Sequence, residues 1–220
     1  MKNIYLDNAA ATPIAPEVQK EMARALKFAG NSSSFNDAGR AVAEELKKAR
    51  LVVARFLGAH AEEIIFTSSG SEANNMAVMC PAFTAPKVRG EIITTPIEHP
   101  SVLGPVKFLR HEDKKVIYVK VDREGLVDVE DIASKISNKT LLVSVMYANN
   151  EIGTIEPIRE IGTLIRDFRK KHNSQPPLFH VDACQAAGYL NMKVNTLGVD
   201  LFTFNGSKIY GPRGAGVLYV

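Results

Sequence analysis

The 220-residue chain has no tryptophan, only two cysteines, and no run approaching the roughly 18 apolar residues of a membrane-spanning helix. Cys80 and Cys184 lie in apolar stretches without C-x-x-C or Cys/His ligand spacing, which excludes a disulfide framework and a zinc site as leading interpretations. The first residues do not form a signal peptide, because Asp7 and Asn8 interrupt them before any apolar region. We therefore expect a protein of the reducing cytoplasm with no membrane segment.

An excess of charge of one sign is also missing. The 27 Lys and Arg residues are nearly balanced by 24 Asp and Glu residues, and the net charge of +3 is scattered, which argues against a nucleic-acid-binding surface. The basic runs at residues 47–48 and 169–171 lie beside acids or at expected helix ends, so they are interpreted as solvated faces. A chain of this length can bury a substantial core, and one α/β domain is expected.

Short apolar runs alternate with segments of helical periodicity along most of the chain. The runs predict strands at residues 64–66, 91–94, 115–119, 141–145, 178–181, 201–204 and 216–220. Helices are expected at residues 16–28, 39–57, 71–82, 101–110, 129–136 and 158–171. In the second of these helices, the expected buried stripe consists of Val42, Leu46, Ala49, Val53 and Phe56. Strands joined by helices imply a mainly parallel sheet covered on both faces, with functional polar residues at the strand ends.

One strand end has the features of a phosphate site. The P-loop pattern is absent, and the glycines of residues 211–216 are in the wrong order for a dinucleotide fingerprint. Residues 64–66 instead run into small polar residues and then a helix. Because the N–H groups of a helix N-terminus attract anions, Gly70 and Ser71 are candidate phosphate ligands, with a simple helix cap as the alternative.

Four further polar clusters each follow a predicted strand: Glu98-His99, Asn149-Asn150-Glu151, His180-x-Asp182-x-x-Gln185 and Asn205-Gly206-Ser207-Lys208. Each cluster alone has a structural explanation, such as a helix cap or an Asx-turn. Four clusters at one edge of a sheet favour a functional cleft, because buried polar groups cost free energy unless they are bonded. A lysine able to form a Schiff base, a carboxylate for a pyridine nitrogen, an imidazole, an amide and a phosphate cup are what pyridoxal phosphate (PLP) requires.

These residues also carry a family resemblance that extends over essentially the whole chain. The chain resembles the N-terminal portion of cysteine desulfurases of the NifS/IscS type, which are class V aminotransferase-fold PLP enzymes. The matching segments are Ile4-Tyr5-Leu6-Asp7-Asn8-Ala9-Ala10, Gly30-Asn31, Phe66-Thr67-Ser68, Glu98-His99, Asn149-Asn150-Glu151-Ile152-Gly153-Thr154, His180-Val181-Asp182-Ala183, Gln185 and Lys208-Ile209-Tyr210-Gly211-Pro212.

The resemblance implies the large domain of a PLP-dependent transferase of the aspartate aminotransferase-like fold. Its seven-stranded, mainly parallel sheet would be covered by helices, and its last strand would be antiparallel. Residues 16–220 would form this PLP-binding domain, incomplete at its C-terminus and truncated before a small domain. Residues 1–15 would pack on that missing small domain.

The resemblance also assigns roles to the residues around the cofactor ring. Lys208 would bind PLP covalently and later move protons, and Asp182 would pair with the pyridinium nitrogen. His99 would stack on the ring face and take part in acid–base steps. Gln185 and Asn150 would contact the phenolic oxygen of the ring and the substrate region.

The phosphate of the cofactor would be held by Gly70 and Ser71, together with the residues before the lysine. Family members commonly read Ser-Gly-His-Lys there, whereas this chain has Asn205 and Ser207 at the Ser and His positions. Asparagine and serine can still donate hydrogen bonds to phosphate, but the imidazole donor of the family pattern is lost.

The implied reaction removes sulfur from L-cysteine, giving alanine and a persulfide on a separate enzyme cysteine. A sulfur-acceptor or Fe–S scaffold protein would receive the sulfur for Fe–S cluster or thio-cofactor assembly, and a cytoplasmic homodimer is expected. Neither Cys80 nor Cys184 matches the family's sulfur-accepting position, so both are interpreted as packed, inert thiols. No metal is part of this assignment.

Three alternatives remain open at this point. Another class V activity, such as a selenocysteine lyase or a transaminase, would use the same cofactor. A non-catalytic remnant could bind PLP without turnover. A metal hydrolase built on His99, His180 and Asp182 is the most distant alternative.

Overall fold

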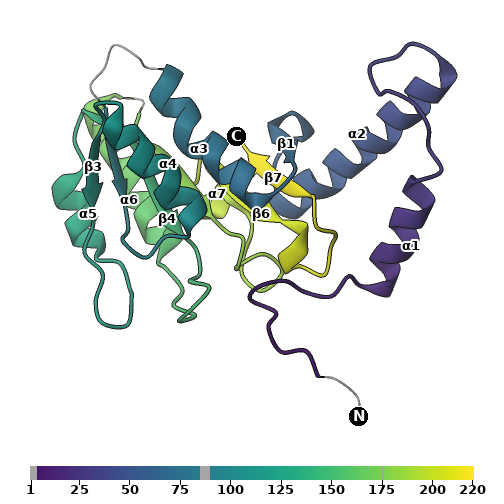
Figure 1. The fold of residues 1–220 in the computed structure, drawn as a ribbon. Helices are drawn as coiled ribbons and strands as arrows, with labels where there is room; N and C mark the ends of the chain where they lie inside the picture. Colours follow the sequence, from purple (N-terminus) through teal and green to yellow (C-terminus); the bar gives the residue numbers. More distant parts are fainter. Residues whose placement is uncertain (1–3, 85–89, 175) are drawn as a thin grey trace.

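A seven-stranded sheet organises the described part of the chain, which comprises residues 4–84, 90–174 and 176–220 of a computed structural model (Figure 1). Its order is β1-β7-β6-β5-β4-β2-β3. Strand β7 is antiparallel to both of its neighbours, whereas the other neighbouring pairs are parallel. The seven predicted strands and the antiparallel last strand are therefore confirmed. The strands are β1 (Ile64–Thr67), β2 (Glu91–Thr94), β3 (Lys115–Tyr118), β4 (Thr140–Met146), β5 (Leu178–Asp182), β6 (Leu201–Asn205) and β7 (Gly216–Tyr219).

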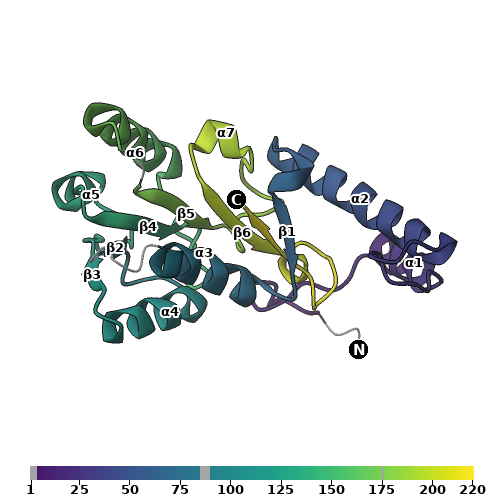
Figure 2. The same ribbon diagram turned by 90° about the horizontal axis from the view of Figure 1, so that it is seen from above.

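Helices cover both faces of this sheet. Figure 2 shows α3 and α4 on one face and α5, α6 and α7 on the other. The predicted helices are all present, but α7 was not expected, because four residues are too few to display a helical period. The helices are α1 (Pro16–Ala25), α2 (Asp37–Leu57), α3 (Gly70–Thr84), α4 (Pro100–His111), α5 (Val129–Lys135), α6 (Ile158–His172) and α7 (Val194–Leu197).

The core lies in two layers, one on each side of the sheet. Phe179 and Phe202 are fully buried in the larger layer, while Val106 and Leu109 belong to the layer beside α3 and α4. The contact of α6 with α7 depends on Gly162, where an added Cβ would lie 2.2 Å from a backbone carbonyl oxygen of α7. These layers make the sheet a rigid support for the loops at its carboxyl edge.

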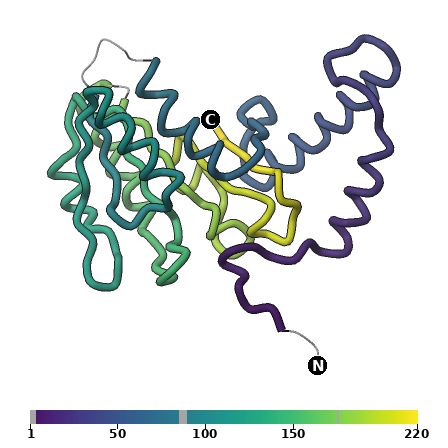
Figure 3. Tube along the Cα trace, viewed as in Figure 1, coloured from purple at the N-terminus to yellow at the C-terminus, as the bar shows by residue number. Residues whose placement is uncertain are grey.

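The long helix α2 does not bury the stripe expected from its periodicity. Leu46 is 37% exposed and Phe56 is 41% exposed, whereas Ala54 and Leu57 are buried. Only the C-terminal end of α2 packs on the sheet, while its other end stands away from the sheet beside α1 (Figure 3). The prediction was wrong because periodicity identifies an apolar face but not whether a partner covers it.

The basic run at the end of α6 is also not wholly a solvated face. The Arg169 side chain is 14% exposed and pairs with the carboxylate of Asp200. That carboxylate also accepts a hydrogen bond of 2.6 Å from the backbone N–H of Phe179, so it lies at the junction of α6, β5 and β6. The arginine compensates the charge of this carboxylate, which the sequence pattern alone did not reveal.

Candidate functional site

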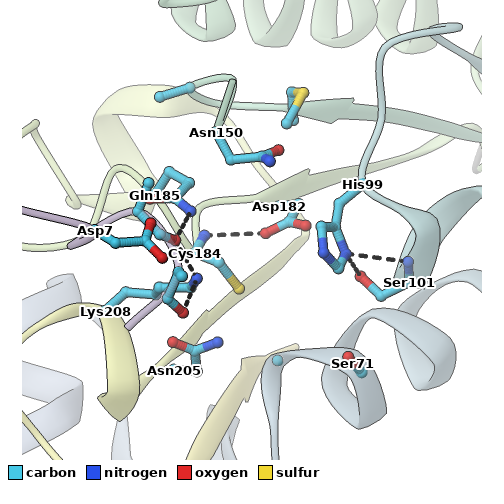
Figure 4. Close-up of a pocket in the computed structure, with 15 residues that line it drawn as sticks. Asp7, Ser71, His99, Ser101, Asn150, Asp182, Cys184, Gln185, Asn205 and Lys208 are labelled. Atoms are coloured by element: carbon cyan, nitrogen blue, oxygen red, sulfur yellow. Dashed lines mark hydrogen bonds between the residues drawn. The ribbon is translucent and has the colours of Figure 1, made fainter. Parts of the chain in front are cut away.

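A cavity of about 420 Å³ lies where the carboxyl ends of β4, β5 and β6 meet the N-termini of α3 and α4 (Figure 4). This volume is in the range of small-molecule sites, and the carboxyl edge of parallel strands is their usual place. The lining residues are Asp7, Ala9, Ala10, Gly70, Ser71, His99, Ser101, Met146, Ala148, Asn150, Asp182, Cys184, Gln185, Asn205 and Lys208.

The structure brings together eight of the nine site residues predicted from the sequence. The exception is Ser207, which does not line the cavity; its hydroxyl donates a 3.3 Å hydrogen bond to Asn205 Oδ1. Its backbone carbonyl accepts a 2.8 Å bond from the Thr12 N–H. Sequence reasoning missed Ser101 and Met146 as site residues. Each lies next to a feature that the sequence had identified, because Ser101 is two residues after His99 and Met146 follows the strand predicted at residues 141–145.

Asp182 ends β5 with its carboxylate held on both sides. It is 5% exposed, its Oδ1 accepts a 3.0 Å bond from the Cys184 N–H, and its Oδ2 accepts a 2.7 Å bond from Asn74 Nδ2. Two hydrogen bonds from N–H donors fix the orientation of this nearly buried carboxylate. Asp182 can therefore face a cationic ring nitrogen.

His99 is fixed at the start of α4. Its Nδ1 accepts a 3.1 Å bond from the Ser101 N–H and lies 2.7 Å from Ser101 Oγ. His99 is the N-cap of α4, and Pro100 occupies the first helical position. Proline is favourable there because it has no N–H that would need a partner. The ring consequently borders the cavity beside Asp182, as Figure 4 shows.

Lys208 lies on the opposite side of the cavity, just after β6. Its amine donates hydrogen bonds to the backbone carbonyls of Ala9 and Ala10, the latter at 2.7 Å. Gln185 Nε2 donates a 2.9 Å bond to the same Ala9 carbonyl. The N-terminal segment therefore contributes to the mouth of the cavity. Its packing against a further domain stays a prediction, and residues 1–3 lie outside the described residues.

The N-terminus of α3 forms the floor beside Asn205. Ser69 Oγ accepts a 3.1 Å bond from the Glu72 N–H, so Ser69 caps the helix and Ser71 does not. A Cβ added at Gly70 would lie 2.6 Å from Cys184 Sγ and 2.8 Å from Asn205 Nδ2, which only glycine avoids. The first N–H groups of a helix have no partner within the helix, and here they border the cavity.

The two cysteines differ in their exposure to solvent. Cys184 has intermediate exposure and lines the cavity, so it is only partly packed; burial, followed by the charge of Asp182, raises the pKa of its thiol well above the ordinary value. Cys80, by contrast, is exposed on α3. The prediction of a packed Cys80 was wrong: its spacing places it on the same side of α3 as the buried Ala73 and Ala77, but near the C-terminal end of the helix this side is exposed.

Two more titratable groups near the cavity are buried. Burial lowers the pKa of His180 to about 4, and its neutral ring lies 2.8 Å from Ser144 Oγ and outside the cavity lining. Burial raises the pKa of Glu98 to about 8. Glu98 Oε1 accepts bonds of 2.8 Å from Thr95 Oγ1 and from the Met146 N–H, while Oε2 has no partner among the described residues.

The metal-site alternative finds no support in this arrangement. The described residues contain no group of three or more His, Cys, Asp and Glu side chains placed to hold a metal ion. None of the described helices is long and apolar enough to cross a membrane.

Comparison with known proteins agrees with this geometry. Residues 4–220 match the family model for Aminotransferase class-V. Cysteine desulfurase IscS of Dictyoglomus turgidum is 42% identical over 220 residues, covering 100% of this chain and 54% of the relative. Cysteine desulfurase IscS of Clostridium botulinum is 44% identical over 223 residues, with the same coverage. The chain thus spans about half the length of these relatives.

Solved structures are also similar. A structure titled "NIFS-LIKE PROTEIN" has a TM-score of 0.93 and 37% identity, covering 100% of this chain and 59% of that one. A structure titled "SspA in complex with cysteine" has a TM-score of 0.91 and 34% identity, covering 99% of this chain and 61% of that one.

Proposed function

Since this chain belongs to the class V aminotransferase family, we propose that it is the PLP-binding portion of a cysteine desulfurase. The observation that carries the proposal is the arrangement of Lys208, Asp182 and His99 around one cavity that also borders the N-terminus of α3. L-Cysteine would be the substrate, and its sulfur would pass to a thiolate as a persulfide while alanine is released.

The donor set of the cavity fits PLP. Asp182 is a carboxylate fixed by two donors, and Lys208 supplies a primary amine from another loop. The amide of Asn205 and the first N–H groups of α3 provide donors for a phosphate. Bound PLP supplies an electron-withdrawing ring that stabilises negative charge on the substrate carbon.

Each residue then has a defined task. Lys208 binds the cofactor covalently and holds or moves a proton at Nζ, for which its amine must first lose its bonds to the carbonyls of Ala9 and Ala10. Asp182 keeps a proton on the ring nitrogen. His99, which lines the same cavity, would contact the ring and exchange protons through Nε2.

The remaining predicted residues complete the binding site. Gln185 and Asn150 orient the phenolic oxygen and the substrate, and Gly70 and Ser71 bind phosphate with Asn205. Ser207 acts indirectly, through its hydrogen bond to Asn205.

The same proposal includes the wider setting. Residues 16–220 form the cofactor-binding domain, and residues 1–15 pack on a further domain. The protein acts as a cytoplasmic homodimer that delivers sulfur to an acceptor or Fe–S scaffold protein. The motif resemblance and the cysteine desulfurase relatives support this part.

The first test is covalent retention of the cofactor. The chain is mixed with PLP, reduced with borohydride and digested, and mass spectrometry is expected to find the PLP mass on Lys208. Lys208→Ala should abolish the adduct, while Lys193→Ala, which removes an amine bonded to the Arg55 carbonyl far from the cavity, should retain it. An adduct on another lysine in the unsubstituted chain would refute the assignment.

The second test separates the alternatives. Alanine formation from L-cysteine supports a cysteine desulfurase, whereas keto-acid formation indicates a transaminase and turnover restricted to selenocysteine indicates a lyase. Bound PLP without any turnover in the full-length protein indicates a remnant. Asp182→Asn should still bind PLP covalently but lose steps that place negative charge on the substrate carbon.

A further inference from the structure

Asn74 is a buried polar residue in an otherwise apolar face of α3. It is 1% exposed, and its buried neighbours on the helix include Ala73, Ala77 and Val78. Burying an amide costs free energy unless every donor and acceptor is bonded. An apolar side chain would pack at this place at lower cost if packing were its whole role.

Every polar atom of the Asn74 amide is bonded. Nδ2 donates one hydrogen to Asp182 Oδ2 at 2.7 Å and the other to Ser101 Oγ at 2.9 Å. Its Oδ1 accepts a hydrogen bond from the Thr203 hydroxyl. Because the Asp182 carboxylate oxygen can only accept, the amide turns its NH₂ group toward Asp182 and Ser101 and its oxygen toward Thr203.

The bond to Ser101 has a consequence for His99. With its oxygen accepting from Asn74, the Ser101 hydroxyl is free to donate to His99 Nδ1, 2.7 Å away. The Ser101 N–H donates to the same nitrogen. Because a backbone N–H can only donate, His99 Nδ1 is the acceptor of this bond, and the Ser101 hydroxyl donates toward the same side of the ring.

We propose that Asn74 is a positioning residue that sets Asp182 and His99 relative to each other through one amide group. Its direct bond fixes the Asp182 carboxylate, and its bond to the Ser101 hydroxyl holds that hydroxyl against His99 Nδ1 and so orients the imidazole ring. The inference rests on the proposed function, in which these two groups hold the ring of PLP from its nitrogen and its face. Asn74 itself does not line the cavity.

Two variants and a matched control test the proposal. Asn74→Asp keeps the shape but removes both donors and sets a second carboxylate against Asp182. Ser101→Ala breaks only the branch to His99. Ser144→Ala is the control. It removes a fully buried hydroxyl that is bonded to His180, and this hydroxyl has no hydrogen bond to Asp182 or His99 among the described residues.

None of the measurements requires turnover. In the protein without PLP, nuclear magnetic resonance follows the ¹⁵N signals of the His99 ring and the ¹³C signal of the Asp182 carboxyl. With PLP, titration at one fixed pH gives the dissociation constant and the absorption spectrum of the bound cofactor. Thermal melting of each variant reports stability separately.

We expect Asn74→Asp to move both sets of signals, to change the spectrum of bound PLP and to weaken PLP binding by about tenfold or more. Ser101→Ala should move the His99 signals alone. Ser144→Ala should lower the melting temperature without these changes. If Asn74→Asp does not fold, Thr203→Val, which removes the donor to Asn74 Oδ1 and loosens the amide, should move the same signals by a smaller amount.

The proposal is overturned if the Asn74 variant changes only the melting temperature, as the control does. It is equally overturned if Ser101→Ala leaves the His99 signals unchanged. If the unsubstituted chain binds no PLP, the proposed function fails, but the signals of His99 and Asp182 without PLP still decide the role of Asn74.

Discussion

Glu98 should make the stability of the protein depend on pH in a way that one substitution removes. Its pKa is about 8 in the folded chain, because burial disfavours the charged form, against an ordinary value of 4.5. Folding therefore favours the protonated acid, and the unfolded chain releases this proton at lower pH. The stability that the protonated acid contributes is fully present below pH 4.5 and is lost as the pH rises to about 8.

The size of the effect follows from these two values. One pH unit corresponds to about 1.4 kcal/mol, so the free energy of unfolding should fall by about 4 kcal/mol between about pH 5 and pH 8 on account of this group. Glu98→Gln should remove this decrease. The glutamine oxygen can still accept the bonds from Thr95 and from the Met146 N–H, so the local structure should be retained.

The assay is urea unfolding followed by circular dichroism at several pH values between about 5 and 8. The two unfolding free energies should diverge with pH, with the Glu98→Gln variant more stable at the upper end. Glu62→Gln, at an exposed position within η1 (Ala61–Glu63), serves as the control and should run parallel to the unsubstituted chain. Parallel curves for Glu98→Gln as well would refute the reasoning, since they would mean that Glu98 is charged in the folded chain.

Three further predictions concern packing and thiol reactivity. Gly70→Ala should weaken PLP binding by about tenfold in a titration, because its Cβ would meet Cys184 Sγ at 2.6 Å, and adding Cys184→Ala should restore part of the affinity. Iodoacetamide should label the exposed Cys80 of the folded chain much faster than Cys184, whose pKa is raised by burial; equal rates by mass spectrometry would contradict this. Gly162→Ala should lower the unfolding free energy by about 3 kcal/mol through its 2.2 Å contact, whereas Gly104→Ala, with nothing within 4 Å, should not lower it.

The sheet could be predicted from the sequence because its strands are nearly continuous apolar runs. β4 is buried along its whole length, so no alternation of polar and apolar residues obscures it. The site followed from the same reasoning, since the carboxyl ends of parallel strands share one edge and the polar clusters after them had to meet. His99 and Asp182 were found in this way.

The remaining features depend on partners that a linear pattern does not contain. The exposed side of α2 and the exposed Cys80 have the periodicity of buried groups, but no described element covers them. Arg169 resembles any surface arginine until Asp200 is placed beside it. Asn74 was missed because an asparagine inside a helix has no distinctive spacing, and only the fold brings Asp182 and Ser101 to its amide.

The position of β7 in the sheet has a consequence for synthesis of the chain. The first strand is joined to the rest of the sheet through the last one, because β7 lies between β1 and β6. While a ribosome is still adding residues 201–215, β1 has no strand to pair with and β6 has one open edge, both of which can pair wrongly with other chains. The sheet is completed only when residues 216–219 insert between β1, made long before them, and β6, made just before them.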